Sequence, residues 1–286
     1  MLRAYENRRE IFFAGNTIGS DGLTGVKRDE VNRMQFYGDL PYANGQTLDV
    51  YLPDGEYSDT VVYFHGGGLE GGDKRDFYYA EIAGEFASRG YAFLSVNYRK
   101  YPEAKFPDYL EDAALSVRYA KERFCGADGK NRLYVAGQSA GAWIALMLCF
   151  DRSYLGRVGV DPDGIDGWMI DSAQPTSHFN VIRHECGADS RLQRIDRYAP
   201  LYYLDENTRF SRMLLVWYED DMPCRPEQNE LLVAAIRQFL PDADVERRRL
   251  TGGHCHGSTE KNEDGKYDFA VVALQWLAKA GKGGKA

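Results

Sequence analysis

Short apolar runs alternate with longer amphipathic stretches from residue 60 to the end of the chain. The apolar runs have the length of buried strands, and the stretches between them have the length of helices. Strands are expected at 60–65, 91–97, 132–137, 165–170, 213–218 and 243–250, and helices at 76–89, 107–124, 140–150, 226–239 and 267–279. Such alternation requires right-handed crossovers. It therefore predicts an α/β fold with a mostly parallel central sheet of about eight strands, covered by helices on both faces.

The remaining segments divide the chain further. Alternating residues at 33–37 and 47–52, with a turn at Asn44-Gly45 between them, predict an antiparallel hairpin at one sheet edge. Residues 1–286 are interpreted as one domain, with an N-terminal arm at 1–30, a cap over the mouth of the site at 171–212 and a flexible tail at 280–286.

The charge balance limits the classes of partner. The chain has 35 basic and 43 acidic residues, a net charge of −8. Nucleic acid and anionic membranes would be repelled, so neither is expected as a partner. No run is apolar enough for a membrane span, and no apolar stretch follows the first basic residues, so no secretory signal is expected. Five cysteines without paired spacing suggest reduced thiols and a cytoplasmic location.

Residues 134–141 read Tyr-Val-Ala-Gly-Gln-Ser-Ala-Gly, an apolar run that leads through G-x-S-x-G into an apolar helix. This pattern is typical of a nucleophile elbow, a tight strand-to-helix turn that exposes the hydroxyl of Ser139. Gly137 and Gly141 are expected where side chains would collide as the helix packs against the strand. Ser139 is therefore the candidate nucleophile.

A second motif, His65-Gly66-Gly67-Gly68, follows the apolar run 60–64. A glycine-rich turn after a strand can direct backbone N–H groups toward an oxyanion. Two such parts in this order indicate acyl-transfer chemistry and predict a serine hydrolase.

A serine nucleophile also needs a base and a carboxylate that orients the base. Three acids, Glu219-Asp220-Asp221, directly follow the apolar run 213–218. The loop Thr251–Ser258 then carries His254 and His256. The order Ser, acid, His matches the pattern of such sites, while the choice of acid and of histidine stays open at this point.

These motifs, together with Asn97-Tyr98-Arg99, Pro102-Glu103 and Phe106-Pro107, resemble the hormone-sensitive-lipase-type carboxylesterases and the related short esterases and arylformamidase-like enzymes. The resemblance covers roughly residues 45–280 and implies an α/β-hydrolase fold. It implies that Ser139 is the nucleophile and that the N–H groups of Gly67, Gly68 and Ala140 form the oxyanion hole. His65 would be structural and hold the glycine loop.

The same resemblance helps to choose the acid and the base. Aligning Tyr218 with a family glycine places Asp221 at the acid position, with Asp220 and the more remote Asp171 as alternatives. Family members often read His-Gly at the base, which favours His256 over the alternative His254.

Other functions are weighed against this hypothesis. His254-Cys255-His256 could form part of a zinc site, but no companion ligand motif is present, so no metal and no cofactor are expected. A binding protein with a broken triad, or a formamidase, amidase or peptidase on the same scaffold, are the alternatives. The expected substrate is a compact ester rather than a long-chain lipid, because many charged residues lie in 171–212. The oligomeric state stays open.

Overall fold

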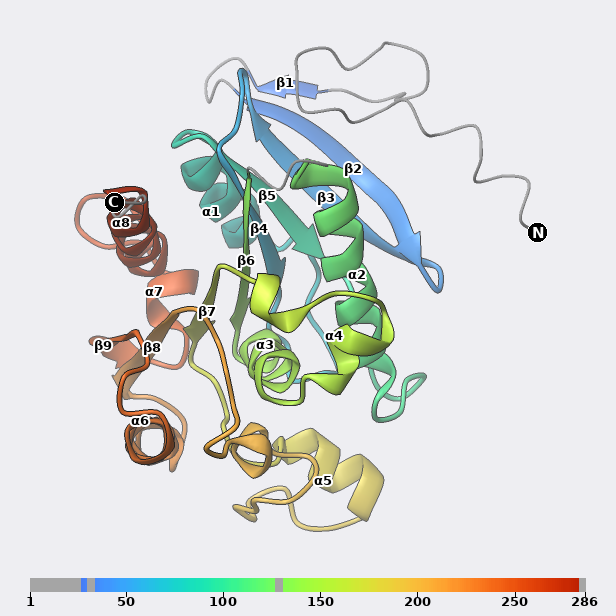
Figure 1. Cartoon of the computed structure of the whole chain (residues 1–286), viewed down its shortest axis with the longest axis vertical. Helices are drawn as coiled ribbons and strands as arrows, with labels where there is room; N and C mark the ends of the chain where they lie inside the picture. The colour runs from blue at the N-terminus through green and yellow to red at the C-terminus, as the bar shows by residue number, and fades with distance from the viewer. Residues whose placement is uncertain (1–26, 30–33, 127–130, 283–286) are drawn as a thin grey trace.

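A computed structural model describes residues 27–29, 34–126 and 131–282 (Figure 1). In these ranges nine strands form one sheet in the order β1-β2-β3-β5-β4-β6-β7-β8-β9. β1, β2 and β3 pair in antiparallel fashion, β3 is antiparallel to β5, and every pair from β5 through β4 to β9 is parallel. The strands span Lys27–Asp29, Met34–Ala43, Gln46–Pro53, Asp59–Phe64, Tyr91–Val96, Arg132–Gln138, Gly167–Asp171, Met213–Asp220 and Val245–Gly253, numbered β1 to β9 in chain order.

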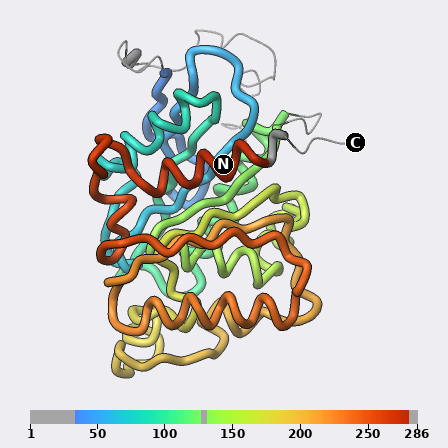
Figure 2. The backbone as a smooth tube through the Cα atoms, turned by 90° about the vertical axis from the view of Figure 1, so that its left-hand side faces the viewer, coloured from blue at the N-terminus to red at the C-terminus, as the bar shows by residue number. Residues whose placement is uncertain are grey.

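Helices cover both faces of the sheet. α1 (Phe77–Ala87) and α8 (Asp268–Lys282) pack on one face, and α2 (Asp108–Phe124), α3 (Ala140–Phe150), α4 (Ser153–Arg157) and α6 (Arg225–Phe239) supply buried side chains to the other. Figure 2 views the molecule from the side of α8, which is drawn in red. α5 (Phe179–Cys186) and the one-turn α7 (His256–Thr259) complete the α-helices of the described ranges.

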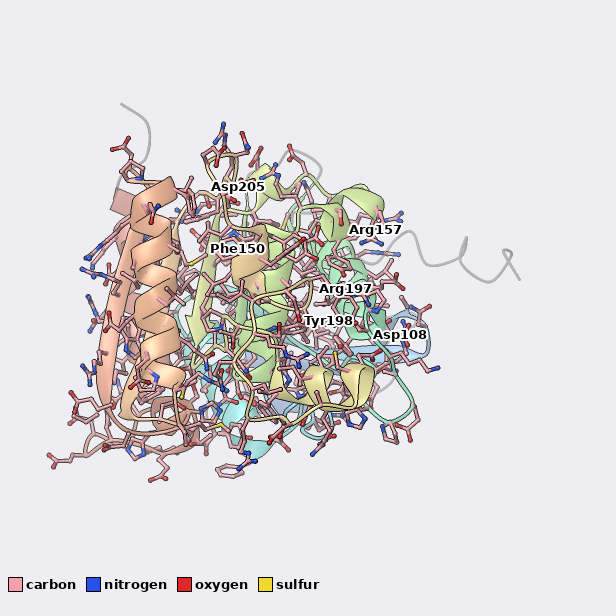
Figure 3. The ribbon with its side chains drawn as sticks, turned by 90° about the horizontal axis from the view of Figure 1, so that it is seen from below. Asp108, Phe150, Arg157, Arg197, Tyr198 and Asp205 are labelled. Carbon is pink, nitrogen blue, oxygen red and sulfur yellow. The ribbon has the colours of Figure 1, made fainter. Side chains whose placement is uncertain are left out.

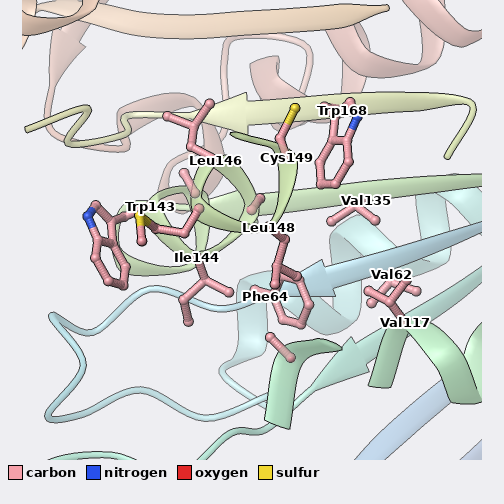
Figure 4. Packing of buried hydrophobic residues seen from close by; sticks show 14 of the residues in the cluster. Val62, Phe64, Val117, Val135, Trp143, Ile144, Leu146, Leu148, Cys149 and Trp168 are labelled. Atoms are coloured by element: carbon pink, nitrogen blue, oxygen red, sulfur yellow. The ribbon is translucent and has the colours of Figure 1, made fainter. Parts of the chain in front are cut away.

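The core is built by strands whose side chains are apolar on both faces. In β4, Val62 and Phe64 join the cluster under α2 and α3, while Val61 and Tyr63 join the cluster under α1 and α8. α3 is apolar on every side, and it is accordingly buried along its whole length (Figure 4). The strand that precedes Ser139 and the helix that follows it are therefore both fixed by the core.

The α/β class and the mostly parallel sheet predicted from the alternation are confirmed. α3 begins and ends at the predicted residues, and the hairpin of β2 and β3 is present, with β1 as a ninth strand outside it. Two segment predictions need correction, because residues 27–29 of the expected arm pair with β2 and residues 280–282 of the expected tail continue α8. The rest of both segments lies outside the described residues.

The predicted cap segment, 171–212, links the end of β7 to β8. It contains α5 and one short 3₁₀ stretch, Pro200–Tyr203, and its Tyr198 carbonyl accepts a hydrogen bond of 3.2 Å from the indole N–H of Trp143 in α3. Figure 3 shows Tyr198 beside that helix, with Arg197 next to it. In the described ranges, none of the helices has the length and apolar character required to cross a membrane.

Candidate active site

Ser139 occupies a sharp turn between β6 and α3. Its backbone angles are φ 52° and ψ −112°, a conformation in which an L-residue is strained. A Cβ added at Gly141 would overlap the carbonyl oxygen of Phe64, and one at Gly137 would overlap that of Gly141. Both glycines are therefore required by close backbone approach, as the elbow pattern predicts.

The hydroxyl of Ser139 meets a histidine from the far end of the chain. Its Oγ lies 2.8 Å from the Nε2 atom of His254, which follows β9. The His254 side chain is 26% exposed, so solvent reaches the pair. A hydroxyl in contact with an imidazole nitrogen is the arrangement by which a serine can lose its proton.

Asp221 lies on the other side of the same imidazole ring. The Nδ1 atom of His254 is 2.5 Å from the Oδ1 atom of Asp221, whose side chain is fully buried. The same Oδ1 accepts a hydrogen bond of 2.6 Å from the N–H of Met222. The neighbouring Asp220, the last residue of β8, is exposed. The carboxylate therefore favours the tautomer with its proton on Nδ1, which leaves Nε2 free to accept from Ser139.

The sequence favours His256 as the base, but the geometry brings His254 to Ser139 instead. Cys255 takes a left-handed conformation with φ 60°, and His256 then begins α7. The His256 ring packs against Gly252 and lies 3.6 Å from a carboxylate oxygen of Glu260. The left-handed residue therefore separates the two histidines, and only His254 meets the serine.

Two consecutive residues at the end of β7 anchor both catalytic segments. The carbonyl oxygen of Asp171 accepts from the N–H of Ser139 at 2.8 Å, and the Ser172 hydroxyl accepts from the N–H of Cys255 at 3.1 Å. The Asp171 carboxyl accepts a hydrogen bond from Ser258 and does not contact His254, although the sequence left Asp171 as a remote alternative acid. Burial raises the pKa of Asp171 to about 7.

The glycine loop that follows β4 lies against the elbow. A Cβ placed on Gly66 would be 3.4 Å from the Cβ of Ser139, so the loop lies close to the nucleophile. Gly67 and Gly68 have φ values of 109° and 66°, which favour glycine. A Cβ on Gly67 would also overlap the carbonyl oxygen of Gly71. The structure thus brings the loop of the predicted oxyanion hole beside Ser139 and Ala140, the first residue of α3.

His65 is buried at the start of this loop. Its Nδ1 donates to the carbonyl oxygen of Gly66 at 2.6 Å, its ring stacks on Tyr98, and the Tyr98 hydroxyl donates to the His65 carbonyl oxygen at 2.8 Å. Burial lowers the pKa of His65 to about 4, so the ring is neutral at physiological pH. These contacts agree with the structural position that the resemblance implies for this residue.

Helix α5 contacts the loop from the predicted cap segment. The Asn180 Nδ2 atom donates to the carbonyl oxygen of Gly68 at 2.6 Å. Arg183 forms an ion pair with Glu70, and the His184 Nε2 atom lies 2.5 Å from the same carboxylate. These three residues have the i, i+3, i+4 spacing of one helical face. This contact is not predictable from the sequence, because no pattern in 171–212 relates that segment to residues 68–70.

Charged residues near the loop are engaged in structural pairs. The Lys74 ammonium is 2.8 Å from Asp39 and 3.1 Å from the buried Asp49, and Arg75 binds the same two carboxylates. Among the residues that the structure describes, no three His, Cys, Asp or Glu side chains are grouped as ligands of a metal ion.

The BD-FAE family model matches residues 48–158, which include the glycine loop and the elbow. Esterase B from Lactobacillus rhamnosis superposes with a TM-score of 0.69 at 16% identity over 87% of each chain. The chain has the α/β-hydrolase fold.

Among curated proteins, this chain is similar to esterase LipI of Mycobacterium tuberculosis, with 38% identity over 98 residues, or 34% of this chain and 30% of that protein. It is also similar to kynurenine formamidase of Danio rerio, with 32% identity over 114 residues, or 38% of this chain and 37% of that protein. The matched segment thus spans about a third of the length of these relatives.

Proposed function

We propose that this protein is a serine hydrolase that cleaves small carboxylic esters through an acyl-enzyme intermediate. The observation that carries the proposal is the continuous contact from Ser139 through His254 to Asp221, with distances of 2.8 and 2.5 Å. Such a line of hydroxyl, imidazole and buried carboxylate is the arrangement that activates a serine at neutral pH. Similarity to esterase LipI supports the same reaction class.

In the proposed reaction, the Ser139 Oγ atom attacks the ester carbonyl carbon while His254 Nε2 takes the hydroxyl proton. The resulting imidazolium is stabilised by Asp221 and then donates this proton to the departing alcohol oxygen. The acyl group stays on Ser139. A water molecule, deprotonated by His254, next attacks the acyl carbon and releases the carboxylic acid, and the serine regains its proton.

The negative charge on the carbonyl oxygen needs donors in both tetrahedral intermediates. We assign this role to the N–H groups of Gly67, Gly68 and Ala140. The proximity of Gly66 to Ser139 supports the assignment, because the loop is then close enough to face a carbonyl bonded to Oγ. These donors stabilise charge that develops only during the reaction, so they act on the turnover rate more than on substrate binding.

The decisive experiment compares the native protein with Ser139→Ala, using p-nitrophenyl acetate and butyrate as substrates. The native protein is expected to hydrolyse both esters and to gain the mass of one phosphonyl group with a fluorophosphonate probe. Ser139→Ala is expected to lose about 10⁴-fold or more in kcat and to remain unlabelled. Equal turnover or equal labelling of the two proteins would overturn the proposal.

Amide hydrolysis is the second candidate, favoured by the similarity to kynurenine formamidase. The same three residues could transfer a formyl group from an aryl amide, since the first attack is identical and the leaving nitrogen takes the proton from His254. Comparison of kcat/KM for an N-formyl aryl amide and for the matching aryl formate ester distinguishes the two. A ratio in favour of the amide would assign the protein to the formamidases.

We infer that residues 1–286 form one hydrolase domain, that the protein resides in the cytoplasm, and that its partner is a small-molecule ester rather than nucleic acid or a membrane. The acidic net charge of −8 supports the last point.

A further inference from the structure

Tyr79 connects the glycine loop to the residue that precedes the nucleophile. It lies near the start of α1 and is 1% exposed. Its hydroxyl accepts a hydrogen bond of 2.8 Å from the N–H of Gly66 and donates one of 2.5 Å to the Oε1 atom of Gln138. Gln138 is the variable second residue of the elbow motif. One hydroxyl group therefore joins two motifs that are about 70 positions apart in the sequence.

The surroundings of Gln138 show that the link is specific. The side chain is only 3% exposed, and its Nε2 atom has no hydrogen-bond partner among the residues that the structure describes. Its Oε1 atom lies where a Cβ on Gly66 would be 2.7 Å away. Burying an amide with one unpaired end costs stability. The hydrogen bond from the Tyr79 hydroxyl satisfies the other end of this amide and fixes it beside Gly66.

We propose that Tyr79 is a positioning residue that fixes the glycine loop at the correct distance from Ser139. This inference rests on the proposed function, because it gives the hydroxyl a role only if the loop holds an oxyanion. Gly66, Gly67 and Gly68 have no side chains to restrain their backbone, so hydrogen bonds must do so. An oxyanion donor acts only when it lies within about 2.7–3.1 Å of the charged oxygen.

Tyr79 restrains Gly66, so the Gly66 N–H is not expected to donate to the oxyanion. Its N–H is already satisfied by Tyr79, which leaves the next two N–H groups for the substrate. A shift of the Gly66 peptide would displace Gly67 and Gly68 together. Loss of the Tyr79 hydroxyl is therefore expected to weaken the whole loop and not a single donor.

The first test is Tyr79→Phe, which removes one oxygen atom and keeps the packing of the ring against Tyr63. With p-nitrophenyl butyrate, kcat is expected to fall about 10-fold or more, while KM changes less than about 3-fold. Tyr134→Phe is the matched control, since it removes a hydroxyl from a tyrosine of β6 that packs on Trp276, and its kcat is expected to match that of the native protein.

A second readout separates positioning from a general loss of structure. Sulfur accepts hydrogen bonds more weakly than oxygen, so a working oxyanion hole favours an oxygen ester over its thiono analogue. The ratio of kcat/KM for the two esters is expected to fall in Tyr79→Phe and to stay unchanged in Tyr134→Phe. A native ratio together with native kcat in Tyr79→Phe would overturn the inference, as would a lower kcat with a native ratio.

Gln138→Met provides a variant for the case in which Tyr79→Phe does not fold. It retains side-chain length, removes the acceptor, and leaves the Gly66 N–H bonded to Tyr79. The ratio of kcat/KM for the oxygen ester and its thiono analogue is expected to fall less than in Tyr79→Phe. A ratio equal to that of the native protein would contradict the proposed link. Fluorophosphonate labelling of the native protein and not of Ser139→Ala separates failure of this inference from failure of the proposed function.

Discussion

Asn180 donates a hydrogen bond of 2.6 Å to the carbonyl oxygen of Gly68, which ties helix α5 directly to the glycine loop. The Asn180 side chain is 3% exposed, and its Oδ1 atom has no partner among the described residues. The predicted cap is thus in contact with the reacting end of the molecule. Rearrangement of α5 and rearrangement of the loop are linked through this amide.

Asn180→Ala is therefore expected to lower kcat for short esters by about 10-fold, with a smaller change in KM, because the loop loses a restraint that matters in the transition state. Steady-state kinetics on p-nitrophenyl acetate measure the effect. Asn207→Ala, at an exposed position of the same segment, is the control and is expected to behave as the native protein does. An unchanged kcat in Asn180→Ala would show that α5 does not restrain the loop during catalysis.

The two histidines of the β9 loop are expected to differ sharply. His254→Ala removes the group in contact with Ser139 and is expected to lose about 10⁴-fold or more in kcat. His256→Ala removes a half-exposed side chain paired with Glu260, and its kcat is expected to stay within about 3-fold of the native value. The reverse pattern would restore the assignment favoured by the family motif.

The acids of the β8 end provide a similar comparison. Asp221→Asn keeps the size of the side chain but removes the charge that selects the His254 tautomer, and kcat is expected to fall about 10⁴-fold. Asp220→Asn changes an exposed side chain and is expected to leave kcat nearly native. Thermal unfolding of both variants checks that the fold is intact. Similar kinetics for both would mean that neither carboxylate orients the base.

The neutral His65 ring predicts a pH dependence of stability. Its pKa is lowered by burial to about 4 in the folded state, against about 6.5 when unfolded, so the unfolded chain binds the proton more readily. The free energy of unfolding is therefore expected to fall as pH drops from about 6.5 to about 4. Above about pH 6.5, His65 is neutral in both states and adds no pH dependence to stability. His65→Asn retains a donor for the Gly66 carbonyl but does not titrate.

Urea unfolding of the native protein and of His65→Asn at several pH values measures this contribution as a difference, in which titration of other groups cancels. The stability gap between the two proteins is expected to narrow as pH falls through the window. A gap that is constant from pH 7 to pH 4 would mean that His65 does not resist protonation in the folded state.

Substrate length is expected to follow the polarity of the cap. Arg183, His184 and Glu70 form a charged cluster between α5 and the loop, and burying a long alkyl chain against them would remove water without providing partners. We expect kcat/KM to be highest for acetyl to butyryl esters and to fall toward decanoyl. Exposed Leu192 and Ile195 in the same segment are the apolar surface that could reverse this order. A steady rise through decanoyl would contradict the prediction.

Much of the fold follows from local patterns in the sequence. The strands from β4 to β8 are continuous apolar runs, and α3 is apolar throughout, so their positions and the elbow between β6 and α3 are predictable. The order of serine, acid and histidine along the chain follows as well, because each follows a recognisable strand.

The choice of histidine was not predictable, since it depends on one backbone angle. Cys255 at φ 60° reverses the direction of the chain, and no residue pattern requires a cysteine to adopt that conformation. The contacts of Tyr79 and Asn180 were missed for another reason. Each joins residues between 13 and 112 positions apart, and in the sequence a buried tyrosine on an apolar helix face is indistinguishable from ordinary core.

Asp171 and Ser172 attach the nucleophile and the base to the same strand end. Asp171 accepts from the Ser139 N–H, and Ser172 holds the loop of His254. A displacement of the end of β7 carries both reacting groups in the same direction and preserves the distance between them. Insertions elsewhere in 173–212 can lengthen the cap without altering that distance. An insertion between Asp171 and Ser172 would instead separate serine from histidine, because each of these two residues holds one of the reacting groups.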